Sequence, residues 1–267
     1  MCVLDQGRGP ASLVLHGFTG CAASMQVVAD ALTPGRRVIR PDLVGHGESD
    51  APDDVAAYTM KACVDQLRAL LDRFSIERVD LIGYSMGGRI ALSLAVASPE
   101  RVRSLALVGA TAGLASASER AARVAADEAL ATRILEHGVE SFVDEWMALP
   151  LFASQQRLGA EALAAARAAR LRGRAIGFAN SLRGMGTGAM PPLHAALPGL
   201  QRPVLLVVGD EDAKFRAIAS ALARALPDAR TAIVPDAGHA AHLENPGAFA
   251  KRLVGFLERV SPTDAGR

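Results

Sequence analysis

The fold is decided by residues 81–89, which read Leu-Ile-Gly-Tyr-Ser-Met-Gly-Gly-Arg. The apolar residues that precede Gly83 are typical of a buried strand, and the residues after Ser85 continue as an apolar helix. Gly-x-Ser-x-Gly between a strand and a helix predicts a sharp turn, allowed by the flanking glycines, that exposes the serine hydroxyl. Ser85 would then lie at a helix N-terminus, where amide N–H groups favour negative charge on its oxygen. The alternative is a tight turn that happens to contain serine.

The same alternation of short apolar runs and helical stretches continues outward from this turn. Runs that are apolar at almost every position are typical of strands buried on both faces of a parallel sheet. The predicted strands are 12–15, 38–40, 79–82, 105–108, 204–208 and 231–234. The predicted helices are 24–32, 59–74, 86–97, 216–226 and 246–260. The sequence therefore predicts an α/β fold, with a mostly parallel central sheet and helices on both faces.

One long segment, residues 113–197, contains no convincing strand and is rich in Ala, Arg and Glu. Because strands resume after it, we predict a helical cap inserted into a core made of residues 1–112 and 198–267. The final residues, 261–267, are polar and are expected to fray.

Composition excludes several classes of protein. Of the 267 residues, 50% are hydrophobic and 21% are charged, which is typical of a packed globular chain and not of a disordered one. The 29 Lys and Arg residues balance 28 Asp and Glu residues, so neither a nucleic-acid partner nor an anionic membrane is indicated. We find no secretory signal and no membrane-spanning run. Cys2, Cys21 and Cys63 lack the spacing of a disulfide framework or zinc site, which favours the cytoplasm.

A serine hydroxyl needs a base such as histidine, and the base needs a carboxylate that orients it. His239 follows a glycine in the loop just beyond strand 231–234, where it could reach over the sheet edge toward Ser85. His242 lies closer to the final helix, and packing or capping explains it better. We therefore predict His239 as the base.

The acid candidates follow strand 204–208, in the run Gly-Asp-Glu-Asp at 209–212. In this type of fold the acid precedes the histidine along the chain. Asp212 is preferred because of its spacing from the end of the strand, with Asp210 as the fallback and Glu211 expected to be solvated. The predicted catalytic residues are Ser85, Asp212 and His239.

Negative charge that develops on a substrate oxygen needs two backbone N–H donors. The N–H of Met86, directly after Ser85, is one candidate. The other is the N–H of Phe18, in the loop His-Gly-Phe-Thr-Gly at 16–20, although a plain strand-exit turn is the alternative. The loop at 42–49 is expected to be structural. Residues 184–188, Gly-Met-Gly-Thr-Gly, resemble a phosphate loop in composition only, so nucleotide binding is disfavoured.

Arg89 lies one helical turn beyond Ser85 on a predicted helix that is otherwise apolar. A buried arginine is costly unless it is paired. It either anchors a structural carboxylate or faces an anionic substrate, and the residues alone leave both possibilities open.

Residues 11–258 resemble an α/β-hydrolase-fold protein, and several segments resemble the family of 2-succinyl-6-hydroxy-2,4-cyclohexadiene-1-carboxylate synthase, a lyase of menaquinone biosynthesis. The matching segments are GYSMGGR at 83–89, LPLFAS at 149–154, SLRGMGTG at 181–188 followed by MP at 190–191, and DAKF at 212–215. The cap segments are the more specific ones, because caps in this superfamily vary with substrate.

The resemblance implies that pyruvate is eliminated from 2-succinyl-5-enolpyruvyl-6-hydroxy-3-cyclohexene-1-carboxylate, a tricarboxylate, without a metal or organic cofactor. It further implies that the serine acts as a base and not as an acylated nucleophile. No partner besides this small molecule is expected, and we expect a monomer or a weak homo-oligomer.

Motif positions carry the family's substrate-binding residues over to this chain. The implied carboxylate ligands are Arg89, Arg123 and Arg170, with Arg172 or Arg174 as replacements for the last. The implied apolar pocket walls are Tyr84, Trp146 and Phe152. Without the resemblance, Arg123 would be expected to pair with Glu119 on a solvated helix face, and Trp146 and Phe152 to be core residues of the cap.

Two other functions compete with this interpretation. A serine esterase or C–C bond hydrolase would use the same three catalytic residues, since fold and triad do not determine the reaction. A carboxylester hydrolase, however, has no need of three cationic positions. A non-catalytic binding protein of the same fold would be expected to lack the acid or the histidine, and both are present.

Overall fold

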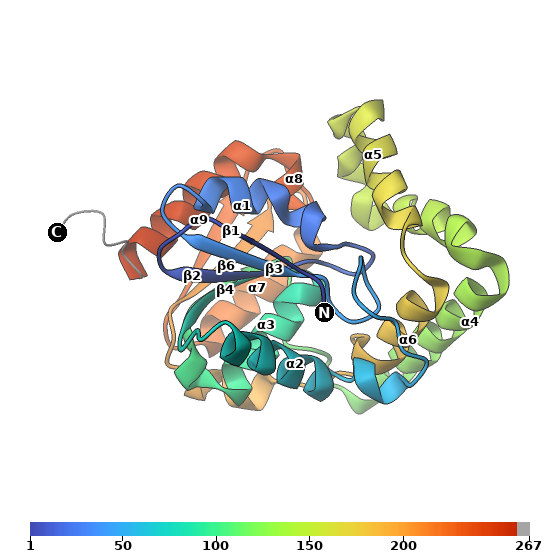
Figure 1. Ribbon diagram of the computed structural model, residues 1–267, viewed down its shortest axis with the longest axis horizontal. Helices are drawn as coiled ribbons and strands as arrows, with labels where there is room; N and C mark the ends of the chain where they lie inside the picture. Colours follow the sequence, from blue (N-terminus) through green and yellow to red (C-terminus); the bar gives the residue numbers. More distant parts are fainter. Residues whose placement is uncertain (261–267) are drawn as a thin grey trace.

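The structure is a computed structural model that describes residues 1–260, and it shows a central sheet with helices packed against both faces (Figure 1). Within these residues the sheet has seven strands in the order β1-β3-β2-β4-β5-β6-β7. β1 is antiparallel to β3, and all other neighbours are parallel. The strands are β1 (Val3–Gln6), β2 (Ala11–Leu15), β3 (Arg37–Pro41), β4 (Val79–Tyr84), β5 (Val102–Val108), β6 (Val204–Gly209) and β7 (Ala229–Val234). The predicted α/β fold class is confirmed.

The helices of the core form one layer on each face of the sheet (Figure 1). One layer consists of α1 (Gln26–Leu32), α8 (Ala241–Glu244) and α9 (Pro246–Val260). The opposite layer consists of α2 (Met60–Arg73), α3 (Met86–Ala97) and α7 (Ala213–Ala225). Short 3₁₀ helices lie in the connections between strands and helices: η1 (Ala22–Met25), η2 (Val55–Tyr58), η3 (Pro99–Arg101) and η5 (His194–Gly199).

The unbroken apolar runs of the strands arise because both faces of the sheet are covered. In β2, Leu13 and Leu15 pack into the core with α2 and α3, whereas Val14 packs into the core with α1 and α9. The same division holds in β4, where Leu81 faces the first core and Ile82 the second. Successive side chains of a strand point to opposite faces, so a strand between two cores has no polar face.

Between β5 and β6 the chain leaves the sheet and, ahead of η5, forms the helical elements drawn in green and yellow at the right of Figure 1. They are α4 (Ala117–Met147), η4 (Pro150–Leu158), α5 (Ala160–Leu171) and α6 (Ala175–Met185). α4 and α6 share a small core of their own that includes Ile134, Phe142 and Phe178. α5 buries none of its residues and is held to α4 by Arg167, which pairs with Asp144 at 2.6 Å.

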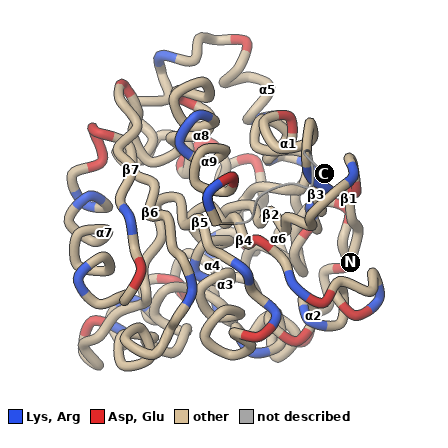
Figure 2. The backbone as a smooth tube through the Cα atoms, turned by 90° about the vertical axis from the view of Figure 1, so that its left-hand side faces the viewer, with Lys and Arg blue, Asp and Glu red and all other residues tan. Residues whose placement is uncertain are grey.

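The sequence does not predict β1. Its residues alternate poorly between buried and exposed positions. In the part of the chain that the structure describes, its only strand partner is β3, to which it adds an antiparallel edge. The two edges of the sheet, β1 and β7, lie at opposite sides of the molecule in Figure 2. The helix expected from residue 216 begins earlier, at Ala213, because the Asp212 carboxylate caps it by accepting a bond from the N–H of Phe215 at 3.1 Å.

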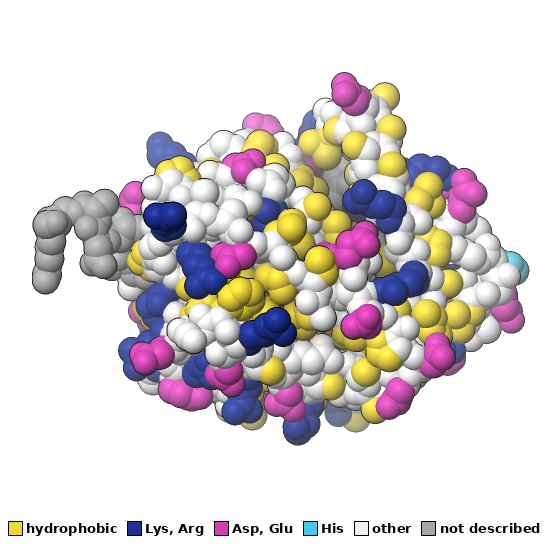
Figure 3. Space-filling view, viewed as in Figure 1, with side chains coloured by type: hydrophobic (Ala, Val, Ile, Leu, Met, Phe, Trp, Pro, Cys, Tyr) yellow, Lys and Arg dark blue, Asp and Glu magenta, His cyan; other side chains and the backbone are white. Residues whose placement is uncertain are grey.

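Basic and acidic side chains are interspersed over the face shown in Figure 3, as the balanced composition leads one to expect. No helix within residues 1–260 is long and apolar enough to span a membrane. The expectation that residues 261–267 fray lies outside the described residues.

Candidate active site

The turn between β4 and α3 holds Ser85 in an unusual backbone conformation, with φ 50° and ψ −107°. Its N–H donates to the carbonyl of Val108 at 2.8 Å, which ties the turn to β5. The flanking glycines are required for a different reason from the one expected. A Cβ on Gly83 would lie 2.4 Å from the carbonyl oxygen of Gly87, and one on Gly87 would lie 2.4 Å from that of Leu15. The serine itself adopts the positive φ, and the glycines permit close packing around it.

Ser85, His239 and Asp212 form a continuous hydrogen-bonded chain. The Oγ of Ser85 lies 3.1 Å from Nε2 of His239, and Nδ1 of His239 lies 3.0 Å from Oδ2 of Asp212. A proton on Nδ1 donates to the carboxylate and leaves the Nε2 lone pair facing the serine hydroxyl. His239 and Asp212 are both buried. This arrangement can remove the serine proton and stabilise the resulting imidazolium.

The neighbouring acids and the second histidine are occupied elsewhere. Asp210 accepts a bond from the N–H of Ala237 at 3.1 Å, and this bond lowers the pKa of its carboxyl. Glu211 pairs with Arg157 at 2.9 Å on the surface. His242 is buried with its ring 4.5 Å from that of Tyr84, and burial lowers its pKa to about 3. His242 is therefore a neutral packing residue.

The loop after β2 brings Phe18 next to Ser85, and both residues line the same cavity. Within residues 1–260 the N–H groups of Phe18 and Met86 make no hydrogen bond to the protein. The loop is held by His16, whose Nδ1 donates to the carbonyl of Gly17 at 2.8 Å while its Nε2 accepts from Leu43 at 3.1 Å. Burial lowers the pKa of His16 to about 4, so its ring is neutral in this role.

A cavity of about 200 Å³ lies over Ser85 and His239, between the sheet edge and the helices of residues 113–197. Its walls are mainly apolar and include the three side chains implied by the family resemblance, Tyr84, Trp146 and Phe152. Phe18 packs edge-on against Trp146, with ring centroids 5.2 Å apart. Ser85 and His239 are part of its polar lining.

Three cationic side chains line the cavity: Arg89, Arg123 and Lys214. Arg89 is buried and its Nη1 donates to the carbonyl of Met185 at 2.6 Å. Burial, together with the nearby charge of Arg123, lowers the pKa of Arg89 to about 10. Even so, the guanidinium stays charged at neutral pH. Its positive charge faces the cavity without an ion-pair partner among the described residues.

The structure places the other predicted arginines differently. Arg123 lines the cavity but pairs with Asp127 at 2.8 Å and not with Glu119. Arg170 is not among the residues that line the cavity; its Nε donates to the hydroxyl of Thr19 at 3.2 Å and its Nη1 to the carbonyl of Ala166 at 3.0 Å.

Neither proposed replacement for Arg170 lines the cavity. Arg172 borders a separate hollow, and Arg174 donates to the carbonyl of Ser49. The third cation is instead Lys214, which the sequence analysis did not select even though it lies in the family-like segment 212–215.

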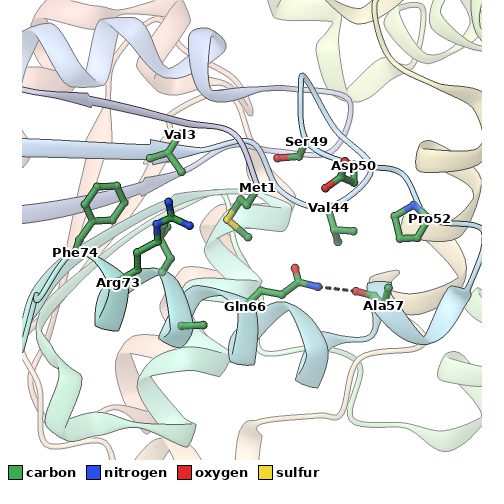
Figure 4. A pocket seen from close by; sticks show the side chains of 12 residues that line it. Met1, Val3, Val44, Ser49, Asp50, Pro52, Ala57, Gln66, Arg73 and Phe74 are labelled. Carbon is green, nitrogen blue, oxygen red and sulfur yellow. Dashed lines mark hydrogen bonds between the residues drawn. The ribbon is translucent and has the colours of Figure 1, made fainter.

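A larger cavity, of about 610 Å³, lies between β1, the loop after β3 and α2, and shares no lining residue with the cavity at Ser85 (Figure 4). No histidine lines it, and its Gln66 side chain is engaged by the carbonyl of Ala57 at 3.1 Å. The smaller cavity contains Ser85 and His239, so we take it as the candidate active site. Among residues 1–260 there is no group of three or more His, Cys, Asp or Glu side chains that could hold a metal.

Comparison with known proteins adds a second line of evidence to the geometry of this site. The profile of the alpha/beta hydrolase fold family matches residues 10–246. A Bacillus subtilis protein provisionally named 2-succinyl-6-hydroxy-2,4-cyclohexadiene-1-carboxylate synthase is 44% identical over 260 residues, covering 97% of this chain and 94% of that protein. The synthase of Klebsiella pneumoniae is 34% identical, covering 95% and 97%. The chain belongs to this synthase family of the α/β-hydrolase fold.

Solved structures agree with the family assignment. MenH from S. aureus superposes on this synthase-family chain with a TM-score of 0.92 at 30% identity, covering 96% of this chain and 98% of that one. A malate-bound esterase from Thermogutta terrifontis superposes with a TM-score of 0.86 at 29% identity, covering 97% and 93%. Because an esterase shares so much of the backbone, the reaction has to be argued from the side chains of the cavity.

Proposed function

We propose that this protein eliminates pyruvate from 2-succinyl-5-enolpyruvyl-6-hydroxy-3-cyclohexene-1-carboxylate, giving 2-succinyl-6-hydroxy-2,4-cyclohexadiene-1-carboxylate in menaquinone biosynthesis. The observation that carries the proposal is the cavity over Ser85, which combines apolar walls with the cations Arg89, Arg123 and Lys214. Such a cavity suits an alicyclic ring that bears several carboxylates. The names of the relatives support the same reaction.

In the proposed reaction the serine acts as a base. His239, oriented by Asp212, takes the proton of the Ser85 hydroxyl across the 3.1 Å contact. The alkoxide then removes a proton from the ring carbon beside the succinyl ketone. The electron pair of that C–H bond moves into the ring and the ketone, and the C–O bond to enolpyruvate breaks. The leaving group departs as the enolate of pyruvate, and it becomes pyruvate by taking up a proton that the imidazolium of His239 gives back.

Negative charge develops on the ketone oxygen during this step. The N–H groups of Phe18 and Met86 are suited to hold it, because neither has a protein acceptor among the described residues. Removing one such donor typically costs ~10²–10³ in kcat. The serine needs no acyl intermediate, and the proposal invokes no metal or organic cofactor.

The cap completes the site in this proposal. Residues 113–197 supply Arg123, Trp146 and Phe152 to the cavity, whereas the core supplies the catalytic residues. We further propose that the protein works in the cytoplasm as a monomer or weak homo-oligomer. Its expected partner is a small molecule, not a nucleic acid or a membrane.

The direct test is to incubate the purified protein with the enolpyruvyl substrate and follow pyruvate release together with the absorbance of the conjugated diene. We expect Ser85→Ala and His239→Ala to abolish activity, with kcat falling by at least about 10³-fold. Arg89→Ala should lower both substrate affinity and turnover. Ser93→Ala is the matched control, since this serine lies on the same helix and donates only to the carbonyl of Arg89.

The second candidate is a serine esterase, favoured by the 0.86 TM-score to the Thermogutta terrifontis enzyme. It would use the same three catalytic residues with water as the second substrate. Robust hydrolysis of p-nitrophenyl esters without pyruvate release would favour this alternative and overturn the lyase proposal.

A further inference from the structure

A buried carboxylate, Asp127, lies directly behind the cations of the candidate active site. It is 4% exposed and does not line the cavity. Its Oδ1 accepts a bond from Nε of Arg123 at 2.8 Å, whereas its Oδ2 has no hydrogen-bond partner among the described residues. A buried acid with one unsatisfied oxygen is costly, so its presence beside an anion-binding cavity needs an explanation.

The bond from Arg123 to Asp127 uses only one side of the guanidinium. Arg123 makes this single protein hydrogen bond among residues 1–260, and its side chain is 43% exposed. Both Nη groups are therefore without a protein acceptor. Because Nε is held from behind, the guanidinium can offer its two Nη groups end-on to a carboxylate in the cavity.

The same carboxylate lies close to the segment that Arg89 contacts. Arg89 donates to the carbonyl of Met185, and the next residue is Gly186. A Cβ on Gly186 would lie 2.5 Å from Oδ2 of Asp127, so only glycine leaves room for the carboxylate there. The end of α6 is thus packed between Arg89 on α3 and Asp127 on α4.

We propose that Asp127 is a positioning residue for substrate binding: it anchors Arg123 by Nε and so presents the Nη groups of Arg123 to a carboxylate of the substrate. This proposal rests on the proposed function, because it requires an anionic ligand in the cavity. Asp127 does not touch the reacting atoms, and its effect passes through Arg123. Its negative charge also offsets the repulsion between Arg89 and Arg123 while the cavity holds no anion.

Two roles for Asp127 make opposite predictions. An acid that merely lowers the positive charge of the cavity would oppose an anionic substrate, so its removal would tighten binding. An acid that positions Arg123 would support binding, so its removal would weaken it. The direction of the change in KM distinguishes these roles.

The experiment measures kcat and KM for pyruvate release in Asp127→Ala and Asp127→Asn. We expect Asp127→Ala to raise KM about tenfold with kcat changed less than about threefold, the size of one lost charge-assisted hydrogen bond. Asp127→Asn keeps an acceptor oxygen and should restore KM to within about threefold of the wild type. A lower KM in Asp127→Ala would overturn the positioning role.

A double-mutant cycle with Arg123→Ala separates positioning from general damage to the fold. In the Arg123→Ala background, Asp127→Ala should change KM by less than about twofold, because there is no longer an arginine to position. An undiminished effect there would contradict the proposal.

The matched control is Glu128→Ala. This residue is the neighbouring acid on α4, and its carboxylate pairs with Arg183 at 2.6 Å. It should leave KM unchanged. Thermal unfolding of each variant identifies any that lose the fold.

Calorimetric titration of Ser85→Ala variants with the same substrate tests the role of Asp127 separately from the proposed reaction. Substrate binding without pyruvate release by the wild type would overturn the proposed reaction and still report on Asp127. Equal dissociation constants for Ser85→Ala and Ser85→Ala/Asp127→Ala would overturn the role of Asp127 alone. A protein that neither binds nor converts the substrate overturns both.

Discussion

Ser85 combines a positive φ of 50° with a hydroxyl held 3.1 Å from a buried imidazole. For a residue with a side chain, such a backbone conformation costs about 1–3 kcal/mol and persists only where its surroundings enforce it. Here the surroundings are the bond from its N–H to Val108 and the close packing of Gly83 and Gly87. At the scale of single residues, the strained backbone conformation of Ser85 directs its hydroxyl into the cavity.

The choice between Asp212 and Asp210 can be tested directly. Asp212→Asn should lower kcat by about 10³–10⁴, because an amide no longer selects the Nδ1–H tautomer of His239. Asp210→Asn should retain most of the activity, since Asp210 bonds to the N–H of Ala237 and does not contact the histidine. Steady-state pyruvate release measures both. The reverse ranking would assign the acid to Asp210.

Lys214 makes a separate prediction at the same scale. Lys214→Met should raise KM by about three- to tenfold with little change in kcat, because one cation of the cavity is lost while the triad stays intact. The effect should shrink as ionic strength rises, since the lysine is exposed and screened. Lys251→Met, on the exposed face of α9, is the control. Equal KM values for the two variants would remove Lys214 from the site.

At the scale of elements, the junction of β2, β4 and α3 sets the position of the site. α3 begins immediately after Ser85, so its first turn packs against the end of β2 with no room for a side chain at Gly87. The loop that carries Phe18 leaves β2 at the same place. The relative position of the serine and the Phe18 N–H therefore depends on backbone packing between these elements.

A pair of glycine substitutions tests this packing. Gly87→Ala should lower the free energy of unfolding by at least about 2 kcal/mol, because its Cβ would meet the carbonyl of Leu15 at 2.4 Å. Gly255→Ala in α9 should leave stability unchanged or raise it by up to about 1 kcal/mol, since only Arg259 lies near and alanine is the better helix former. Urea unfolding measures both. A Gly87→Ala variant as stable as the wild type would refute the close-packing argument.

At the scale of the whole molecule, three buried histidines are kept neutral by the fold. Burial lowers the pKa of His16 to about 4 and those of His46 and His242 to about 3. In the unfolded chain these rings take up a proton near pH 6.5. Between about pH 4 and 6.5 the unfolded state therefore binds more protons than the folded state, and stability falls as the pH is lowered.

We expect the free energy of unfolding to drop on going from pH 7 to pH 5. Below about pH 6.5 each of the three histidines contributes up to about 1.4 kcal/mol per pH unit. Urea unfolding at several pH values measures the slope. His242→Gln should make it shallower, whereas His137→Gln, at an exposed position of α4, should leave it unchanged. If the wild type, His242→Gln and His137→Gln all had the same slope, the pH dependence could not be assigned to buried His242.

The sequence by itself determined the α/β alternation, the serine turn and the order in which acid and histidine follow it. These features depend on local signals: continuous apolar runs between two cores, glycines at a strand–helix junction, and polar residues at strand ends. The short strand β1 escaped prediction because its pairing with β3 is its main support, and pairing is not a local property.

Only the tertiary structure decided which cations face the cavity. Arg170 and Lys214 are equally plain basic residues in the sequence, yet Thr19 and a carbonyl of α5 engage the first while the second lines the cavity. The direction of a long charged side chain depends on how the surrounding segments pack, as Thr19, 151 residues away along the chain, shows for Arg170. Arg123 likewise pairs with Asp127 and not with Glu119, although both acids lie one turn away on the same helix. We attribute this pairing to the burial of Asp127 against α6.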